Sequence, residues 1–292
     1  MKTAILSVVL VSLVLGVRAQ YQDTTANEEV RNRRLRTVVI AGSVTYGAGL
    51  AGLNHLWYKE SSRQSFAFFN DLKEWKQVDK VGHFFSAFYL SYGTDKLLQW
   101  CGVPDDKSAL PAALTGFLML LPIEIMDGFS SDYGASAGDL TANALGSLLF
   151  FGQKKAWNEI RIYPKFSYHA TDYPLIRPEA LGNTFAARLL KDYNAQTYWL
   201  SVDADKFFTF PKWLNVAVGY GVADMPYALD VINEKMGYDP YRQYYVSLDP
   251  DLTAIPTRSK AIRTVLTLLN VIKIPSPTVE FSRKGTRFHW FY

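Results

Sequence analysis

Three short groups of polar side chains lie at the ends of otherwise apolar stretches of the chain, and their types suit acid–base or metal chemistry. The groups are Asp79, Lys80 and His83, then Glu124 and Asp127, and then Asp139 and Asn143. A charged side chain costs free energy in apolar surroundings unless it is paired, caps a helix or binds a ligand. The three groups are therefore candidates for one functional site.

The first group can activate a histidine. Asp79 and His83 are four positions apart, so they share one face of a helix. A carboxylate in that place orients the imidazole, selects its tautomer and raises its basicity. His83 can then act as a general base or as a metal ligand. The alternative is structural, because Asp79 is also a favoured residue type for a helix N-cap.

The second group ends the most apolar segment of the chain. Glu124 and Asp127 are three positions apart and closely follow Pro122. Apolar surroundings disfavour the charged form of Glu124 unless a cation or a hydrogen-bond donor meets it. Lys80 and His83 are the natural partners, and the alternative is that such a pair is a purely structural ion pair.

The third group opens the next apolar segment. Asp139 and Asn143 are four positions apart and share a helical face. Asp139 has a structural alternative as a helix N-cap. Asn143 has one as well, since its neighbours Ala142, Ala144 and Gly146 let helices approach closely enough for a hydrogen bond between them.

Convergence of the three groups would place carboxylates, one imidazole, one amine and one amide together, a set that suits a divalent metal ion or acid–base hydrolysis. The catalytic candidates are His83, Asp79, Lys80, Glu124 and Asn143, and the candidate metal ligands are His83, Glu124, Asp127 and Asp139. One histidine with several carboxylates fits magnesium, manganese or calcium better than zinc. A calcium-binding loop over residues 127–139 is a further alternative, and a plain solvated turn is favoured over it.

The composition restricts the classes of protein. The chain has 292 residues, of which 49% are hydrophobic and 15% aromatic, and this aromatic content favours large protein or membrane interfaces. The net charge of +4 does not indicate a nucleic-acid partner. The single Cys101 excludes an internal disulfide and a cysteine-based zinc site.

The first 19 residues are typical of an export signal. Lys2 supplies the positive charge, residues 4–16 supply the apolar run, and Ala19 is a suitable last residue before cleavage. We expect a mature chain that begins at Gln20, and an uncleaved anchor is the alternative. No cysteine follows the apolar run, so the sequence indicates no lipid anchor of its own.

Four apolar segments must position the polar groups, and all are predicted to be helices: residues 37–58, 81–100, 109–126 and 139–151. Residues 20–36 are predicted to be a polar tail ending in a basic cluster. None of the segments reaches the 20 or so clean apolar residues that a membrane span needs. An exported basic cluster also opposes the positive-inside tendency. We therefore expect a membrane-associated four-helix core over residues 37–157.

Residues 158–292 are predicted to form a small antiparallel sheet of about five strands, because apolar and polar residues alternate there. Residues 259–271 predict one amphipathic helix, whose apolar face contains Ile262, Val265, Leu266 and Leu269. Phe288, Trp290 and Tyr292 predict an aromatic edge hairpin, with contact with the outer membrane as the alternative. The predicted fold class is thus α+β.

Three ordered blocks, residues 78–84, 124–128 and 136–146, resemble the YfiM-like predicted periplasmic lipoproteins, a family of unknown function from Gram-negative envelopes. The same blocks are similar, more distantly, to the VanZ-like membrane proteins. The resemblance covers about residues 37–155, and the Tyr/Trp-rich C-terminal part resembles the longer family members. It implies an envelope location and a helical core, and it supplies no reaction.

Two functions are predicted for an envelope protein on the periplasmic side, associated with the outer membrane. The leading hypothesis is a non-catalytic component that helps to assemble or scaffold an outer-membrane machine, with a membrane or an envelope complex as its partner and no nucleic acid. The alternative is a hydrolase or transferase acting on an envelope lipid or glycan, with Mg, Mn, Ca or Zn as the metal. Proximity of His83, Glu124 and Asp139 beside an open cleft would favour the enzyme.

Overall fold

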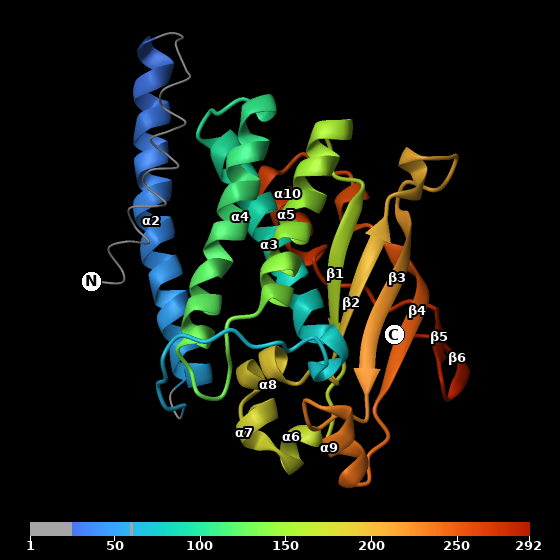
Figure 1. The fold of residues 1–292 in the computed structure, drawn as a ribbon. Helices are drawn as coiled ribbons and strands as arrows, with labels where there is room; N and C mark the ends of the chain where they lie inside the picture. Colours follow the sequence, from blue (N-terminus) through green and yellow to red (C-terminus); the bar gives the residue numbers. More distant parts are fainter. Residues whose placement is uncertain (1–24, 59–60) are drawn as a thin grey trace. The chain divides into compact units, whose positions relative to one another are not determined.

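The computed structural model describes residues 25–58 and 61–292 (Figure 1). The predicted signal peptide, residues 1–19, lies outside the described residues. Over the described part, the chain forms two compact units. The helical unit extends to Asn70 and includes Ser86–Glu159, and the sheet unit contains Asp71–Phe85 and Ile160–Tyr292. The boundary falls inside one uninterrupted helix, α3 (Val78–Trp100).

Helices occur where the apolar segments predict them. The helical unit contains α2 (Thr25–Tyr58), most of α3, α4 (Asp105–Gly128) and α5 (Ala137–Trp157). Small residues bring these helices close together: a Cβ added to Gly116 on α4 would lie 2.1 Å from Ser91 Oγ on α3. Ser91 in turn donates a hydrogen bond to Ser147 of α5, over 3.2 Å. The core of this unit therefore lies among α3, α4 and α5.

Helix α2 differs from the prediction in two ways. It begins at Thr25, so residues 25–36 are helical and do not form the expected polar tail. It is also largely exposed, and Leu35 is its one buried side chain among those described. Helix α2 lies along α4 in Figure 1, where Tyr46 donates a hydrogen bond to the Met119 carbonyl. The predicted four-helix core is thus not confirmed.

Helix α4 is the most apolar helix of the described residues. Among the described helices, only α4 is long and apolar enough to cross a membrane. Length and composition are the only criteria here, and a partly buried core helix meets them as well. Its first turn carries Asp105 and Asp106, which favour a helix N-terminus because of the helix dipole. Asp105 also pairs with Lys154 near the end of α5. Membrane association of the helices is therefore not established by the fold.

The sheet unit contains an antiparallel sheet of six strands in sequential order, within residues 162–289. The strands are β1 (Ile162–Tyr168), β2 (Gln196–Val202), β3 (Leu214–Ala223), β4 (Tyr241–Pro250), β5 (Thr278–Ser282) and β6 (Gly285–His289). Strand β1 is additional to the five predicted strands. Pro164 lies inside it, and proline is tolerated there because β1 is an edge strand. The α+β fold class is confirmed.

One face of the sheet has an aromatic core and another part of it is polar. Trp199, Ala217 and Tyr245 are buried together, with Tyr292 packed against them. Beside this core, Lys165 is the cross-strand partner of Trp199. Lys165 and Asp249 are both fully buried and form an ion pair with a 2.7 Å separation of nitrogen and oxygen. Cross-strand register brings these residues together, so neither cluster depends on sequence neighbours.

Short helices complete the sheet unit: α6 (Tyr173–Ile176), α7 (Pro178–Leu181), α8 (Phe185–Lys191), α9 (Asp230–Lys235) and α10 (Lys260–Leu269), with 3-10 turns η1 (Glu74–Gln77), η2 (Ala204–Lys206) and η3 (Leu252–Ala254). The predicted amphipathic helix is α10. Ser259 caps it by accepting a hydrogen bond from the Ile262 N–H. None of its residues is buried.

Candidate metal centre

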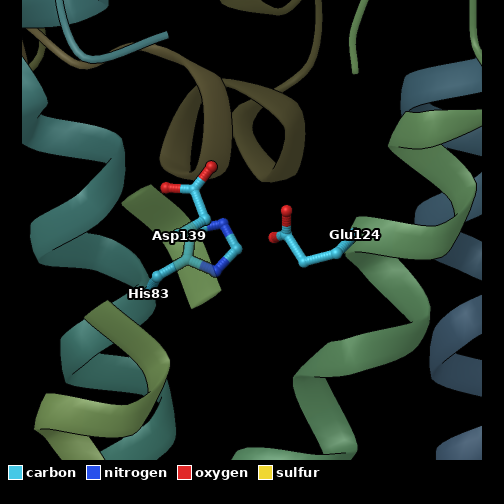
Figure 2. Close-up of side chains that lie close together, drawn as sticks. All are labelled: His83, Glu124 and Asp139. Atoms are coloured by element: carbon cyan, nitrogen blue, oxygen red, sulfur yellow. The ribbon is translucent and has the colours of Figure 1, made fainter. Parts of the chain in front are cut away.

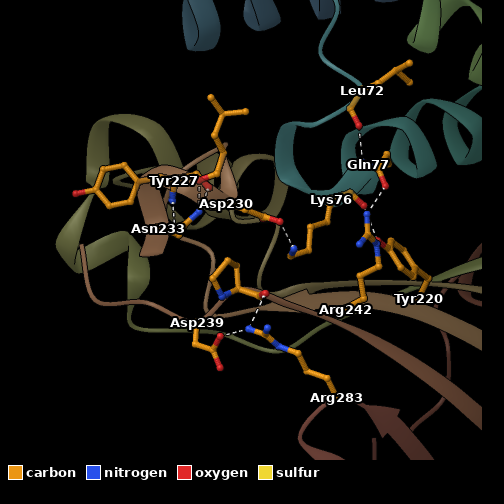
Figure 3. A network of polar contacts seen from close by, with 12 residues as sticks. Leu72, Lys76, Gln77, Tyr220, Tyr227, Asp230, Asn233, Asp239, Arg242 and Arg283 are labelled. Atoms are coloured by element: carbon orange, nitrogen blue, oxygen red, sulfur yellow. Dashed lines mark hydrogen bonds and ion pairs between the residues drawn. The ribbon is translucent and has the colours of Figure 1, made fainter. Parts of the chain in front are cut away.

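A left-handed turn fixes where α3 begins. Trp75, Lys76 and Gln77 have φ angles of 47°, 47° and 67°, a conformation that non-glycine residues rarely adopt. Bonds within the sheet unit hold it, and in one of them Trp75 N–H donates to the Ala228 carbonyl. Tyr220 O–H donates to the Lys76 carbonyl, and Arg242 donates to Gln77 Oε1 (Figure 3). Asp79 consequently lies within the first turn of α3 rather than ahead of it as an N-cap.

Lys80 is the centre of a buried charge group in the sheet unit. Its Nζ lies 2.9 Å from Asp71 Oδ2 and 3.1 Å from Asp79 Oδ2. Burial raises the pKa of the Asp79 carboxyl, and the Lys80 ammonium opposes that shift. Asp79 Oδ1 has no hydrogen-bond partner among the described residues. Lys80 is thus held as a paired cation, and Asp71 is a member of the group that the sequence did not indicate.

Glu124 and Asp139 are joined through the N-terminus of α5. Glu124 is 3% exposed, and its Oε2 accepts a hydrogen bond from the Ser136 N–H at 3.0 Å. Ser136 is the N-cap of α5, because its hydroxyl accepts from the Asp139 N–H at 3.1 Å. The N-cap interpretation of Asp139 is therefore wrong. The positive end of the helix dipole stabilises both carboxylates here.

Figure 2 shows one side chain from each sequence group, His83, Glu124 and Asp139, which lie close together. One ligand atom each from His83 of α3, Glu124 of α4 and Asp139 of α5 lies within 4.8 Å of the other two. Asp139 also belongs to a second such set, with Asp71 and Asp79. Two ligands of one ion at 2.0–2.6 Å are at most about 4–5 Å apart. The ligand atoms of each set are close enough together to hold one cation.

Asp127 belongs to neither of these sets. Its Oδ1 accepts a hydrogen bond from the Tyr58 hydroxyl of α2 at 2.6 Å. Burial, and then the Asp127 charge, raise the pKa of Tyr58. Asp127 thus connects the ends of α4 and α2, which is a structural role, and its assignment as a metal ligand has no support from the geometry.

The loop after α4 is held by the segment that follows α2. Backbone bonds connect Ala67 N–H to the Gly128 carbonyl at 2.9 Å and Ala135 N–H to the Ala67 carbonyl at 3.0 Å. A Cβ on Gly128 would lie 2.3 Å from the Phe66 ring, so a larger residue there would displace that ring. The small residues of this loop are explained by packing and by turn formation. This agrees in part with the prediction of a solvated turn.

Asn143 lies one turn beyond Asp139 on α5 and is fully buried. The i, i+4 spacing places the two side chains on the same face of the helix. His83 follows Asp79 by the same spacing on α3. Asp139 and His83 thus each have a polar residue one turn away that can orient a bound molecule or the imidazole.

These features define an α+β protein with a candidate site of one imidazole and two buried carboxylates. Residues 67–151 match the model of a family described as predicted periplasmic lipoprotein (DUF2279). No curated protein and no solved structure matches the chain. The match confirms the resemblance to this family over a range that contains every site candidate. It supports an envelope, periplasmic location, and it gives no support for the likeness to VanZ-like proteins.

Proposed function

We propose that the protein is a periplasmic component of the cell envelope that binds one divalent metal ion through His83, Glu124 and Asp139. The observation that carries this proposal is the mutual distance of at most 4.8 Å between their ligand atoms. Two of the three side chains are buried carboxylates on separate helices. A divalent cation offsets the cost of keeping two negative charges in such surroundings.

The donor set of one imidazole and two carboxylates fits manganese, with zinc as the alternative. Imidazole nitrogen suits zinc, while carboxylate oxygen suits manganese, calcium and magnesium. Three protein ligands leave a coordination position for water or substrate, as in catalytic rather than structural zinc sites. Such an ion lowers the pKa of a bound water and polarises carbonyl or phosphoryl oxygens. The activity that we propose is hydrolysis or group transfer on an envelope lipid or glycan.

The remaining candidates take supporting roles in this proposal. Asp79, four positions before His83, orients the imidazole and sets its tautomer. Asn143, one turn after Asp139, positions the substrate. Lys80 is held by Asp71 and Asp79, so it contributes fixed positive charge rather than a free amine.

A structural or assembly component is the second candidate function. Lys80 with its two carboxylates is one buried ionic network, and Asp95 is another. Asp95 is fully buried on α3, accepts hydrogen bonds from Ser108 and Gln99, and lies 3.9 Å from Lys154 Nζ. Networks of this kind can fix one packing arrangement of helices. In this alternative the polar residues stabilise the fold, and the protein acts by binding partner proteins.

We also propose that the protein contacts an anionic membrane surface through α10. Ile262, Val265 and Leu269 on one face are 52%, 53% and 51% exposed. Residues 252–279 contain no acidic residue, while Arg258, Lys260 and Arg263 are basic and exposed. A basic amphipathic helix with an open apolar face suits a lipid interface. We assign this contact to the outer membrane, since Phe288 and Trp290 are exposed aromatic residues at the C-terminus.

Metal content tests the central proposal. Mass spectrometry of the purified mature chain, after dialysis with zinc and manganese, is expected to give one ion per chain. His83→Gln and Glu124→Gln should each lose it, whereas His55→Gln, at an exposed histidine on α2, should keep it. No bound metal in the wild type, or full metal in both site variants, would overturn the proposal and favour the assembly component.

A further inference from the structure

The sheet unit contains a second polar site, away from the candidate metal ligands. A cavity of about 450 Å³ opens there, lined by Lys76, Tyr241, Arg242, Tyr244, Phe281 and Arg283 among others. Small-molecule sites have volumes of about 300–1,000 Å³. Figure 3 shows Lys76, Arg242 and Arg283 reaching this region from η1, from β4 and from the turn between β5 and β6.

The cations of the cavity have unequal partners. Lys76 is 6% exposed, and its Nζ lies 2.6 Å from Asp230 Oδ2. Arg283 pairs with Asp239, and both of these side chains are more than half exposed. Arg242 donates to two neutral acceptors, Gln77 Oε1 at 2.8 Å and Tyr220 Oη at 3.1 Å. Its positive charge is therefore not matched by an acid in these bonds.

A cavity lined by these three cations suits an anionic ligand. Arginine retains further N–H groups after two bonds, and its planar fork binds phosphate oxygens in pairs. The pair of Arg283 with Asp239 is exposed and contributes little, so a phosphate can compete with Asp239 for Arg283. Lys76 is buried and adds its positive charge to the cavity while it stays paired with the half-exposed Asp230. The cavity therefore offers three cations to one dianion.

Aromatic side chains form the rest of the lining. Tyr244 is 52% exposed and Phe281 is 45% exposed, and their positions are paired across β4 and β5. Tyr241 also lines the cavity, and the Lys284 ammonium lies 4.4 Å from its ring centroid. Flat apolar faces beside a cationic centre suit a ligand that has a ring as well as a charge.

We propose that this cavity binds a phosphorylated sugar, with Arg242, Lys76 and Arg283 holding the phosphate and Tyr244 and Phe281 packing against the ring. Free sugar phosphates and the headgroups of phosphorylated glycolipids share this chemistry. The site does not depend on a metal ion and stands apart from the proposed function.

Isothermal titration calorimetry with glucose 1-phosphate tests the assignment, with glucose and inorganic phosphate as comparison ligands. We expect a Kd of roughly 1 mM or lower for glucose 1-phosphate, and weaker binding by about tenfold or more for the other two. An alkyl phosphodiester of glucose in detergent micelles distinguishes the sources: tighter binding than that of glucose 1-phosphate identifies a glycolipid headgroup, and weaker binding a free sugar phosphate.

Variants separate ligand contact from folding. Arg242→Gln and Arg283→Gln should each weaken binding of glucose 1-phosphate by about tenfold, and Arg258→Gln, at an exposed arginine outside the cavity, should not. Because Arg242 also holds Gln77, Arg283→Gln is the variant that leaves the turn at residues 75–77 intact. No heat of binding by the wild type, equal binding of inorganic phosphate, or unchanged affinity in both variants would refute the proposal.

Discussion

The substitution Glu124→Gln separates a metal centre from a structural network, because it removes charge and keeps shape. The Gln side chain has the same length as Glu, and its Oε1 can still accept the hydrogen bond from the Ser136 N–H. The α5 N-cap is unaffected, since Ser136 Oγ makes that bond. The variant should therefore fold and lose one of three metal ligands.

The expected magnitude has two parts. A metal ion present at about 100 times its Kd stabilises the native state by about 2.7 kcal/mol. For a chain of this size, such a difference corresponds to roughly 5–10 °C in melting temperature. Loss of the negative charge near the α5 N-terminus costs the variant about 0.3–1 kcal/mol. Without metal, wild type and variant should thus differ little, and with metal they should differ by about 3 kcal/mol.

Differential scanning calorimetry of both proteins, with EDTA and with added zinc or manganese, measures these differences. The wild-type melting temperature should fall in EDTA, and that of Glu124→Gln should be the same in both buffers. Glu179→Gln, at an exposed carboxylate paired with Arg177, is the matched control and should respond as the wild type does. Equal melting temperatures of the wild type in the two buffers would refute the reasoning.

Three other perturbations test separate parts of the molecule. Lys165→Met should lower the free energy of unfolding in urea by about 3–5 kcal/mol, because it leaves the Asp249 carboxylate buried without its cation; a loss below about 1 kcal/mol contradicts this. Burial raises the pKa of the Asp203 carboxyl to about 7, and the nearby Asp251 charge adds to this shift. The native state therefore binds more protons than the unfolded state between about pH 4 and 7. The free energy of unfolding falls as pH rises through that window. Asp203→Asn should therefore stabilise the protein at pH 8 by up to about 4 kcal/mol and much less at pH 4, and equal effects at both pH values in urea denaturation would exclude this cause. Val265→Glu on α10 should abolish co-sedimentation with vesicles containing anionic phospholipid, while the wild type should bind these and not neutral vesicles; equal sedimentation of both proteins removes the lipid contact.

Much of the helical part could be predicted from the sequence. The apolar segments at residues 81–100, 109–126 and 139–151 fall inside α3, α4 and α5. Polar residues that interrupt such segments are costly in a helical core, and this cost indicates the three polar groups that contain His83, Glu124 and Asp139. Ser136, three positions before Asp139, is a readable N-cap signal as well, and it explains why the helix begins after Ser136 rather than after Asp139.

Other parts depend on contacts that no sequence pattern carries. Lys165, Asp249 and Asn270 come together because of strand register and the position of α10, and they are far apart along the chain. Asp71 lies in a polar connection with no periodicity. Helix α2 continues through residues 25–36 because charged residues do not break a helix, and Glu28 pairs with Arg31 three positions later.

The turn at residues 75–77 connects the sugar-phosphate cavity with the start of α3 inside the sheet unit. Left-handed non-glycine residues cost about 1–3 kcal/mol each, so this conformation persists only where neighbours over-determine it. Tyr220 and Arg242 from the sheet and Ala228 before α9 supply those bonds. Lys76 on this turn lines the cavity, and α3 begins two residues later. Strain is thus concentrated in the turn directly before the first residues of α3, where Asp79, Lys80 and His83 lie.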